Sequence, residues 1–267
     1  MCCHGRIQAM PSLRELLDVA TEAAYLGGRR TLAYFGADVQ VETKGDATPV
    51  TRADREAETI IRDYIGRYFP SHTIIGEEHG EQKGDADYRW IIDPIDGTKT
   101  FIHGVPFYGV LIGLEIKGEA SVGAVYLPAF DEMLAAANGL GCSWNGRPAQ
   151  VSKVDNLADA TLLTTSVTSA MKRSNAYETL VSKTKLQRTW GDCYGYVLVA
   201  TGRAEIMLDP AMNPWDCAPM LPILREAGGH FTTWAGEATI WGADGMATNA
   251  ALHQEVLAIL ATEQRHI

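Results

Sequence analysis

The stretch from residue 90 to residue 98, WIIDPIDGT, constrains the fold of this chain more than any other. An apolar run leads directly into two carboxylates, Asp93 and Asp96, which stand on either side of a proline and are followed by a glycine. Such a run predicts a buried strand, and Pro94 predicts a turn at the end of that strand. We expect the Ile95 carbonyl and the Asp96 carboxylate to face the same side as Asp93.

The end of this stretch predicts a binding place for an anion beside the acids. A helix that begins at Gly97 leaves the backbone amides of Gly97 and Thr98 without partners inside the helix. Free amides at the start of a helix bind phosphate, and a glycine lets the backbone approach the ligand closely. The stretch therefore predicts acids for a metal ion and amides for a phosphate group.

Further acids follow the predicted ends of other elements. Glu77 and Glu78 follow the apolar segment TIIG, and Asp216 follows Asn213 and Pro214. Asn is a favourable N-cap and Pro a favourable first helical residue, which puts Asp216 in the first turn of a helix. A single acid at such a place is usually a cap. Carboxylates gathered from separate segments are typical of a Mg²⁺ site, because Mg²⁺ takes oxygen ligands.

Two prolines interrupt the helix that is predicted to contain Asp216. Pro219 and Pro222 both fall inside it. A proline in a helix interior removes a backbone hydrogen bond and costs about 3 kcal/mol, so we expect this helix to be kinked or short. Asp216 remains a candidate ligand because it precedes both prolines.

The periodicity of apolar residues predicts an α/β fold with two halves. The first helix is expected from Ser12, with Glu15 as its capping-box partner, and the second from about residue 51 to residue 69. Strands predominate from there to the turn at WNGRP, and two of them are expected on either side of a turn at Lys117, Gly118 and Glu119. After about residue 154 strands alternate with helices. We predict an α+β N-terminal half over residues 1–153 and an α/β C-terminal half over residues 154–267.

Composition excludes several classes of protein. The 267 residues, 46% of them hydrophobic, can bury a full core, and no apolar run is long enough to span a membrane. The start, MCCHGRIQAM, does not resemble a secretory signal, and a net charge of −10 disfavours nucleic acid as a partner. An odd, scattered set of cysteines predicts reduced thiols in the cytoplasm. These are Cys2, Cys3, Cys142, Cys193 and Cys217. We interpret Cys2, Cys3 and His4 as a frayed terminus rather than a metal site.

Three segments resemble, in order and spacing, the signatures of the inositol monophosphatase superfamily of Mg²⁺-dependent phosphatases. They read PSHTIIGEEHG, WIIDPIDGTKTFIHGVPFYGVLIGLE and NPWDCAPMLPILREAGG. The resemblance runs from KGDATPVTRAD to MATNAALH. It implies a layered αβαβα sandwich of the inositol monophosphatase and sugar phosphatase type, usually as a homodimer. It also implies two or three Mg²⁺ ions, with Glu77, Asp93, the Ile95 carbonyl, Asp96 and Asp216 as ligands.

The resemblance further implies how the reaction is catalysed. Glu77 and Thr98, with Asp54 behind Thr98, would position and activate the attacking water. A metal held by Glu77 and Asp93 would lower the pKa of that water, and a second metal held by Asp93, Asp96 and Asp216 would neutralise the leaving oxygen. Thr98 as a nucleophile is the rival role, but no His or Lys stands beside it in sequence to activate it.

The segments RTWGDCYGY and MLDPAMNPWD predict the substrate. We expect Asp192, Asp209 and Asn213 near the phosphate site, with Arg188 as a further contact. An unpaired carboxylate in a closed pocket is costly, so it demands a cation on the ligand. RTWGDCYGY and TLLTTS resemble the histidinol-phosphate phosphatase branch, which implies hydrolysis of L-histidinol phosphate in the penultimate stage of histidine synthesis. In the competing interpretation Asp192 only caps the helix that begins there.

Other functions remain open on the sequence. The superfamily also contains inositol-1-monophosphatases and nucleoside bisphosphate phosphatases, and Arg188, Trp190 and Tyr194 could form the adenosine pocket that the latter need. A cation or phosphate sensor that is not an enzyme could use the same acids, but it would not need Thr98 or Asp54.

Overall fold

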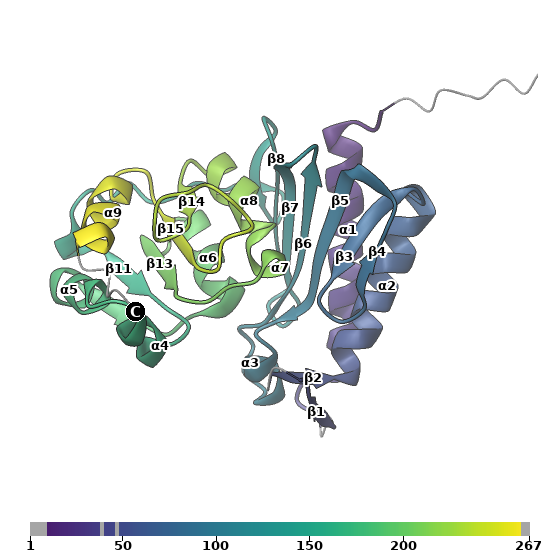
Figure 1. Cartoon of the computed structure of the whole chain (residues 1–267), viewed down its shortest axis with the longest axis horizontal. Coiled ribbons are helices and arrows are strands. Elements are labelled where there is room, and N and C mark those ends of the chain that lie inside the picture. The colour runs from purple at the N-terminus through teal and green to yellow at the C-terminus, as the bar shows by residue number, and fades with distance from the viewer. Residues whose placement is uncertain (1–9, 38–39, 46–47, 263–267) are drawn as a thin grey trace, which may run out of the picture.

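The computed structural model describes residues 10–37, 40–45 and 48–262 (Figure 1). The interpretation of Cys2, Cys3 and His4 lies outside these residues. Within the described part of the chain, no helix is long and apolar enough to cross a membrane.

An eight-stranded sheet occupies the region from residue 72 to residue 148, in the strand order β10-β9-β8-β7-β6-β5-β3-β4. Its strands are β3 (His72–Gly76), β4 (Gly80–Gln82), β5 (Asp85–Asp96), β6 (Gly109–Ile116), β7 (Glu119–Leu127), β8 (Glu132–Ala137), β9 (Gly141–Trp144) and β10 (Arg147–Pro148). All neighbours are antiparallel except β3 and β5, which are parallel. The hairpin predicted around Lys117 is present, and both Lys117 and Gly118 have the positive φ that a two-residue hairpin turn needs.

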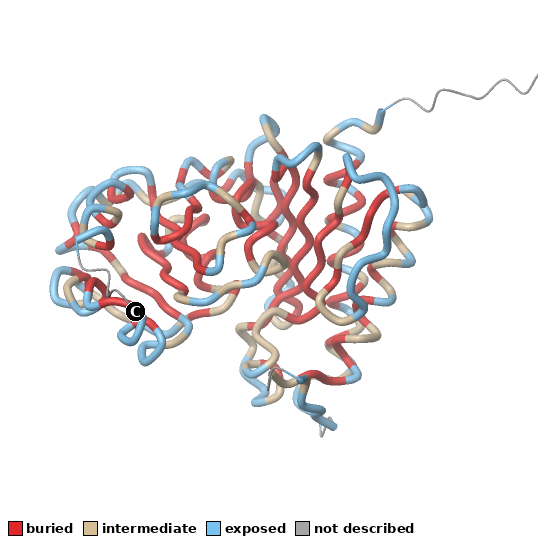
Figure 2. The backbone as a smooth tube through the Cα atoms, viewed as in Figure 1, coloured by how far each residue is buried: buried red, intermediate tan, exposed pale blue. Residues whose placement is uncertain are grey.

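Two long helices cover one face of this sheet, α1 (Leu13–Thr31) and α2 (Arg52–Tyr68). The predicted capping box of Ser12 and Glu15 begins α1, and Thr51 forms a second capping box with Asp54 at the start of α2. Between these helices a short hairpin pairs β1 (Val41–Thr43) with β2 (Pro49–Thr51). The central strands are buried on both faces, which explains their continuous apolar sequence (Figure 2).

A five-stranded sheet follows in the C-terminal part, in the order β12-β11-β13-β15-β14. Its strands are β11 (Thr161–Leu163), β12 (Leu186–Arg188), β13 (Ile206–Asp209), β14 (His230–Thr232) and β15 (Gly245–Thr248). The helices of this part are α4 (Val167–Arg173), α5 (Ala176–Lys183), α6 (Asp192–Ala200), α7 (Pro214–Cys217), α8 (Met220–Glu226) and α9 (His253–Thr262), and α3 (Thr98–Ile102) follows β5.

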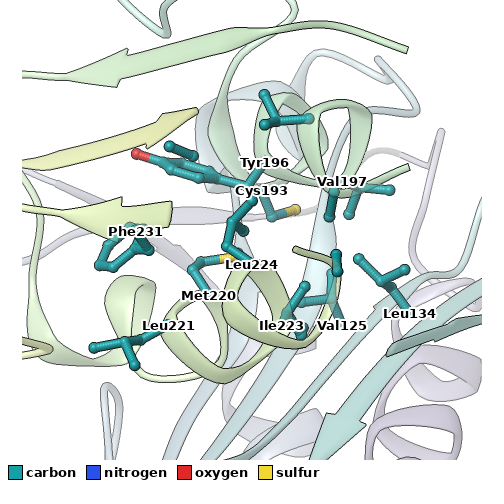
Figure 3. Close-up of a cluster of buried hydrophobic side chains, with 14 of the residues drawn as sticks. Val125, Leu134, Cys193, Tyr196, Val197, Met220, Leu221, Ile223, Leu224 and Phe231 are labelled. Carbon is teal, nitrogen blue, oxygen red and sulfur yellow. The ribbon is translucent and has the colours of Figure 1, made fainter. Parts of the chain in front are cut away.

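Alternating residues of both sheets define the layers. On β5, Trp90 and Ile92 pack against α1 and α2, while Ile91 packs against α6 and α8. On β13, Met207 packs against α6 and α8 from the other side, and Ile206 faces α4, α5 and α9. Helices α6 and α8 therefore form a layer that both sheets share (Figures 1 and 3). The result is the layered αβαβα sandwich that the resemblance implied.

The helix predicted after Asn213 is broken at Pro219. Helix α7 ends at Cys217, and α8 begins directly after Pro219, with Pro222 in its first turn, where no helical amide partner is needed. Two glycines let this break lie directly on the large sheet. A Cβ on Gly113 would be 2.4 Å from the Cβ of Ala218, and a Cβ on Gly123 would be 2.3 Å from the Pro219 carbonyl oxygen. This contact holds α7 against β5 and β6.

Candidate active site

Three of the predicted acids meet where β5 and α7 approach each other. Carboxylate oxygens of Asp93, Asp96 and Asp216 all lie within 4.8 Å of one another. In a regular strand Asp93 and Asp96 would point to opposite faces. The register of β5 against β6 runs from Asp93 opposite Leu111 to Asp96 opposite Gly109, so β5 contains one extra residue here. This bulge turns both carboxylates to the same side, as the Asp-Pro-Ile-Asp pattern predicted.

The electrostatics of the three acids favour a bound cation. Burial, together with the charges of Glu77 and the other two acids, raises the pKa of Asp93 well above its usual range. Burial and the charges of Asp192 and Asp216 do the same for Asp96. Burial is also the largest cause of the raised pKa of Asp216, which is about 6. Carboxylates this close resist ionising together, and a divalent cation removes that conflict.

Glu77 stands at the edge of this group, paired with a lysine. Lys44, in the loop between β1 and β2, donates to Oε1 of Glu77 at 2.7 Å and to Oε1 of Glu78 at 2.5 Å. Besides burial, the charge of Glu77 contributes to the raised pKa of Asp93. Burial raises the pKa of Glu78 to about 7. Lys44 is a residue that the sequence patterns did not indicate.

The predicted helix start at Gly97 is present and is bound to α2. Gly97 has φ of +81°, a backbone conformation that favours glycine, and α3 begins directly after it. The Thr98 hydroxyl donates to the Ile95 carbonyl at 3.1 Å and to Oδ1 of Asp54 at 3.4 Å. Asp54 is fully buried, and its other oxygen accepts from the amide and hydroxyl of Thr51 at 2.8 and 2.6 Å. Asp54 therefore lies behind Thr98, in the arrangement that the resemblance implied.

A cavity of about 90 Å³ opens beside the three acids. Residues from both halves line it: Asp96, Thr165, Asp192, Cys193, Tyr196, Asp209, Ala211, Met212, Asp216 and Met220. Asp192 and Asp209 were predicted to contact substrate, and both are in this lining. Asn213 is the exposed N-cap of α7, and Arg188 lies on the edge strand β12 with its guanidinium 5.9 Å from the Trp190 ring. Neither Asn213 nor Arg188 is among the lining residues.

Asp192 lies between the cavity and the loop at Gly97. It is the first residue of α6 and has φ of +49°, with its amide donating to the Thr165 hydroxyl at 2.8 Å. Its carboxylate accepts from the Thr100 hydroxyl at 2.7 Å, and a Cβ on Gly97 would be 2.9 Å from its Oδ2. The hydrogen bond thus reaches α3 rather than an amide of α6, which disfavours the interpretation of Asp192 as a simple cap. Burial raises the pKa of Asp192.

Asp209 forms the far wall of the cavity. Its carboxylate accepts from the Thr165 amide and from the Tyr196 hydroxyl, both at 3.1 Å. Burial raises the pKa of Asp209 to about 7. Thr165 and Tyr196 were not predicted as site residues. Tyr196 could have been found from its spacing, because it is four residues after Asp192 on α6 and such residues share a helix face.

The three side chains considered for an adenosine pocket have separate partners. Tyr194 stacks on Phe107 with ring centroids 4.6 Å apart, while Arg188 lies over Trp190. None of the three lines the cavity beside the acids.

Comparison with known proteins identifies the family. The model of the inositol monophosphatase family matches residues 12–266. The chain belongs to this family. It is 43% identical to a histidinol-phosphatase of Chlorobaculum parvum, over 93% of this chain and 98% of that protein. It is 41% identical to a histidinol-phosphatase of Mycobacterium tuberculosis, over 85% of this chain and 90% of that protein. Its structure matches the Thermotoga maritima IMPase with a TM-score of 0.85 and 32% identity, over 93% of this chain and 97% of that one.

Membership of the inositol monophosphatase family makes this chain a phosphatase of a metal-dependent kind. The residues present fit a metal, since three carboxylates from two elements converge and a bound cation would stabilise their ionised forms, which burial and their mutual repulsion disfavour. All the atoms that could bind the metal are oxygens, the ligand type of hard divalent cations.

Proposed function

We propose that this phosphatase hydrolyses L-histidinol phosphate to L-histidinol and phosphate, with Mg²⁺ as its cofactor. The observation that carries the proposal is the pair of carboxylates, Asp192 and Asp209, that line the cavity beside the metal acids. Burial raises the pKa of Asp192, and the nearby charge of Lys99 offsets part of this rise. A substrate with a neutral polyol would bring no further counter-charge to this carboxylate, and an incompletely paired carboxylate in a closed pocket is costly. A leaving group with an ammonium and an imidazole supplies that charge. The two relatives named histidinol-phosphatases support the same substrate.

The residues that would hold Mg²⁺ are Glu77, Asp93, Ile95 through its carbonyl, Asp96 and Asp216. When bound, Mg²⁺ would lower the pKa of the attacking water and neutralise charge on the leaving oxygen. A hard cation fits this set because every ligand atom is an oxygen. The proposal includes two or three ions, and a titration of bound Mg²⁺ per chain would count them.

The residues of this chain would position the water and the phosphate for the reaction. The hydroxyl of Thr98 donates its proton toward Asp54 and the Ile95 carbonyl, so its lone pairs are free to accept a hydrogen bond from the attacking water. Glu77 would orient the same water from the opposite side. The backbone amides of Gly97 and Thr98 would bind the phosphate oxygens.

Recognition of the leaving group would be the role of Asp192 first and Asp209 second. The Asp192 carboxylate reaches both the loop at Gly97 and the cavity, so it can pair with a cation next to the phosphate. Asp209 is held by Thr165 and Tyr196 and would accept from a ring N–H further in. The proposal rests on these two acids, because Asn213 and Arg188 do not line the cavity.

A comparison of kcat/KM for L-histidinol phosphate and inositol 1-phosphate, both with Mg²⁺, tests this proposal. We expect histidinol phosphate to be preferred, and Asp192→Asn to lower its kcat/KM by about 10- to 100-fold, or about 1.4 to 2.7 kcal/mol. This loss is smaller than the about 3–5 kcal/mol for breaking a fully buried charge pair, because Asp192 is only half-buried. Preference for inositol phosphate would favour the alternative inositol-1-monophosphatase. Release of phosphate from nucleoside bisphosphates would favour the bisphosphate phosphatase. Hydrolysis of none of these esters would favour the sensor. The homodimer and the cytoplasmic location stay predictions, and sedimentation would check the first.

A further inference from the structure

Glu58 lies behind the turn that carries Glu77. It is on α2, one helical turn after Asp54, and its side chain is fully buried. Its carboxylate accepts from the backbone amide of Glu78 at 2.7 Å and from that of His79 at 3.1 Å. The geometry points to Glu58 as a positioning residue, which fixes the turn of residues 77–79 so that Glu77 presents its carboxylate to the metal. This inference rests on the proposed role of Glu77 as a metal ligand.

The charge of Glu58 is balanced inside the same structure. Arg62, four residues later on α2, donates from Nε to Oε1 of Glu58 at 2.7 Å and from its guanidinium to the Gly80 carbonyl. The pair therefore holds the turn at both ends. Stability alone does not account for a buried ion pair here, because replacing such a pair by well-packed apolar residues is often neutral or stabilising. Because Glu58 and Arg62 both contact the turn, we infer that the pair fixes the position of the backbone of residues 77–79.

Gly76 supplies independent support. It is the last residue of β3 and directly precedes Glu77. A Cβ on Gly76 would be 2.0 Å from Oε1 of Glu58 and 2.4 Å from its Cδ. Gly76 does not have a positive φ, so space rather than backbone conformation requires the glycine. The chain thus leaves room for the Glu58 carboxylate beside the strand end that leads to the metal ligand.

Glu58 acts on Glu77 through the backbone. The Glu77 carboxylate itself contacts Lys44, and Glu58 holds the two amides that follow Glu77. Residues behind a metal ligand typically contribute 10- to 100-fold, about 1.4 to 2.7 kcal/mol, to metal affinity. The cavity lined by Asp192 and Asp209 is formed by other elements. Loss of the Glu58 contacts should therefore weaken metal binding and leave substrate affinity nearly unchanged.

Metal binding to substrate-free protein tests the inference. Mn²⁺ alone, titrated by electron paramagnetic resonance, should bind about 10-fold or more weakly to Glu58→Gln and to Gly76→Ala than to wild type. The matched controls are Glu56→Gln, at a glutamate on the same helix as Glu58 that pairs with Arg30 of α1 and Arg52 of α2, and Gly66→Ala, where a Cβ meets nothing within 4 Å. Both controls should bind Mn²⁺ as wild type does. At saturating Mg²⁺, the KM of the two test variants should stay within about twofold of wild type.

Several outcomes would overturn the inference. Wild-type Mn²⁺ affinity in a folded Glu58→Gln or Gly76→Ala variant would reduce Glu58 to a structural role, even if the melting temperature fell. If Glu58→Gln does not fold, Gly76→Ala decides the matter alone, and failure of both to fold would also leave only a structural role. Absence of Mn²⁺ binding in wild type would remove the metal site and this inference together. Weaker Mn²⁺ binding in both variants, with no hydrolysis of histidinol phosphate by wild type, would support the inference and refute only the proposed substrate.

Discussion

Asparagine in place of Asp209 should stabilise the metal-free protein at high pH. Asp209 is buried, and burial raises its pKa from an ordinary 3.8 to about 7. Between about pH 4 and pH 7 the folded protein keeps a proton that the unfolded chain releases, so the free energy of unfolding falls as the pH rises. Asn carries no titratable proton, and this loss of stability should be absent from the variant.

The size of the effect follows from the change in pKa. A rise from 3.8 to about 7 corresponds to on the order of 4 kcal/mol once the pH exceeds 7. The hydrogen bonds at this position survive the change, because the Asn carbonyl can accept from the Thr165 amide and its NH₂ can donate to the Tyr196 oxygen. The variant should therefore match wild type near pH 4 and exceed its unfolding free energy by up to that amount at pH 8.

Urea unfolding in EDTA, followed by circular dichroism across this pH range, measures the difference. Asp159→Asn, at an exposed position in the short 3₁₀ helix Leu157–Asp159, is the matched control and should show no pH-dependent gain. Parallel pH profiles for wild type and Asp209→Asn would refute the reasoning, because they would show that the carboxylate is no harder to ionise in the folded protein than in the unfolded chain.

Three further substitutions test the site itself. Asp93→Asn should lower Mg²⁺-dependent kcat by several orders of magnitude and leave the protein folded, because removing one acid relieves like-charge repulsion; activity near wild type would rule out this site. Thr98→Ala should lower kcat about 100-fold with unchanged Mn²⁺ affinity, and equal losses of both would make Thr98 structural. Gly97→Ala forces a side chain to φ of +81° and puts a Cβ 2.9 Å from Oδ2 of Asp192, so it should cost about 1–2 kcal/mol of stability and raise KM; an unchanged KM would argue against substrate contact by Asp192.

The elements that sequence predicted correctly carry their signals locally. The capping box at Ser12, the turn at Lys117 and the helix start at Gly97 each depend on a few adjacent residues, and all three are present. The acids at the ends of β5 and in α7 could be predicted as a group because each follows an apolar run or a helix cap. Pro219 correctly predicted a short helix.

The features that sequence did not predict depend on packing between distant segments. Helices α4 and α5 contain mostly polar residues, and their few buried side chains, such as Ala170 and Leu180, give too little periodicity to read. The strand β15 is only four residues long. In the sequence, Lys44 is an ordinary charged residue of a polar loop and Glu58 an ordinary charged residue of a helix. Only the fold shows that both reach the turn at Glu77, because their partners are many residues away.

The bulge in β5 makes the length of the segment between Asp93 and Asp96 matter more than its composition. Inserting one residue between Asp93 and Asp96, with the bulge still one residue wide, would turn the Asp96 carboxylate to the opposite face, among the side chains that pack under α1 and α2. There no metal or amide would receive it, and the charge would be buried in an apolar layer. We therefore expect a single-residue insertion here to abolish the site outright, whereas replacing Pro94 by another residue that can adopt the same turn should be tolerated.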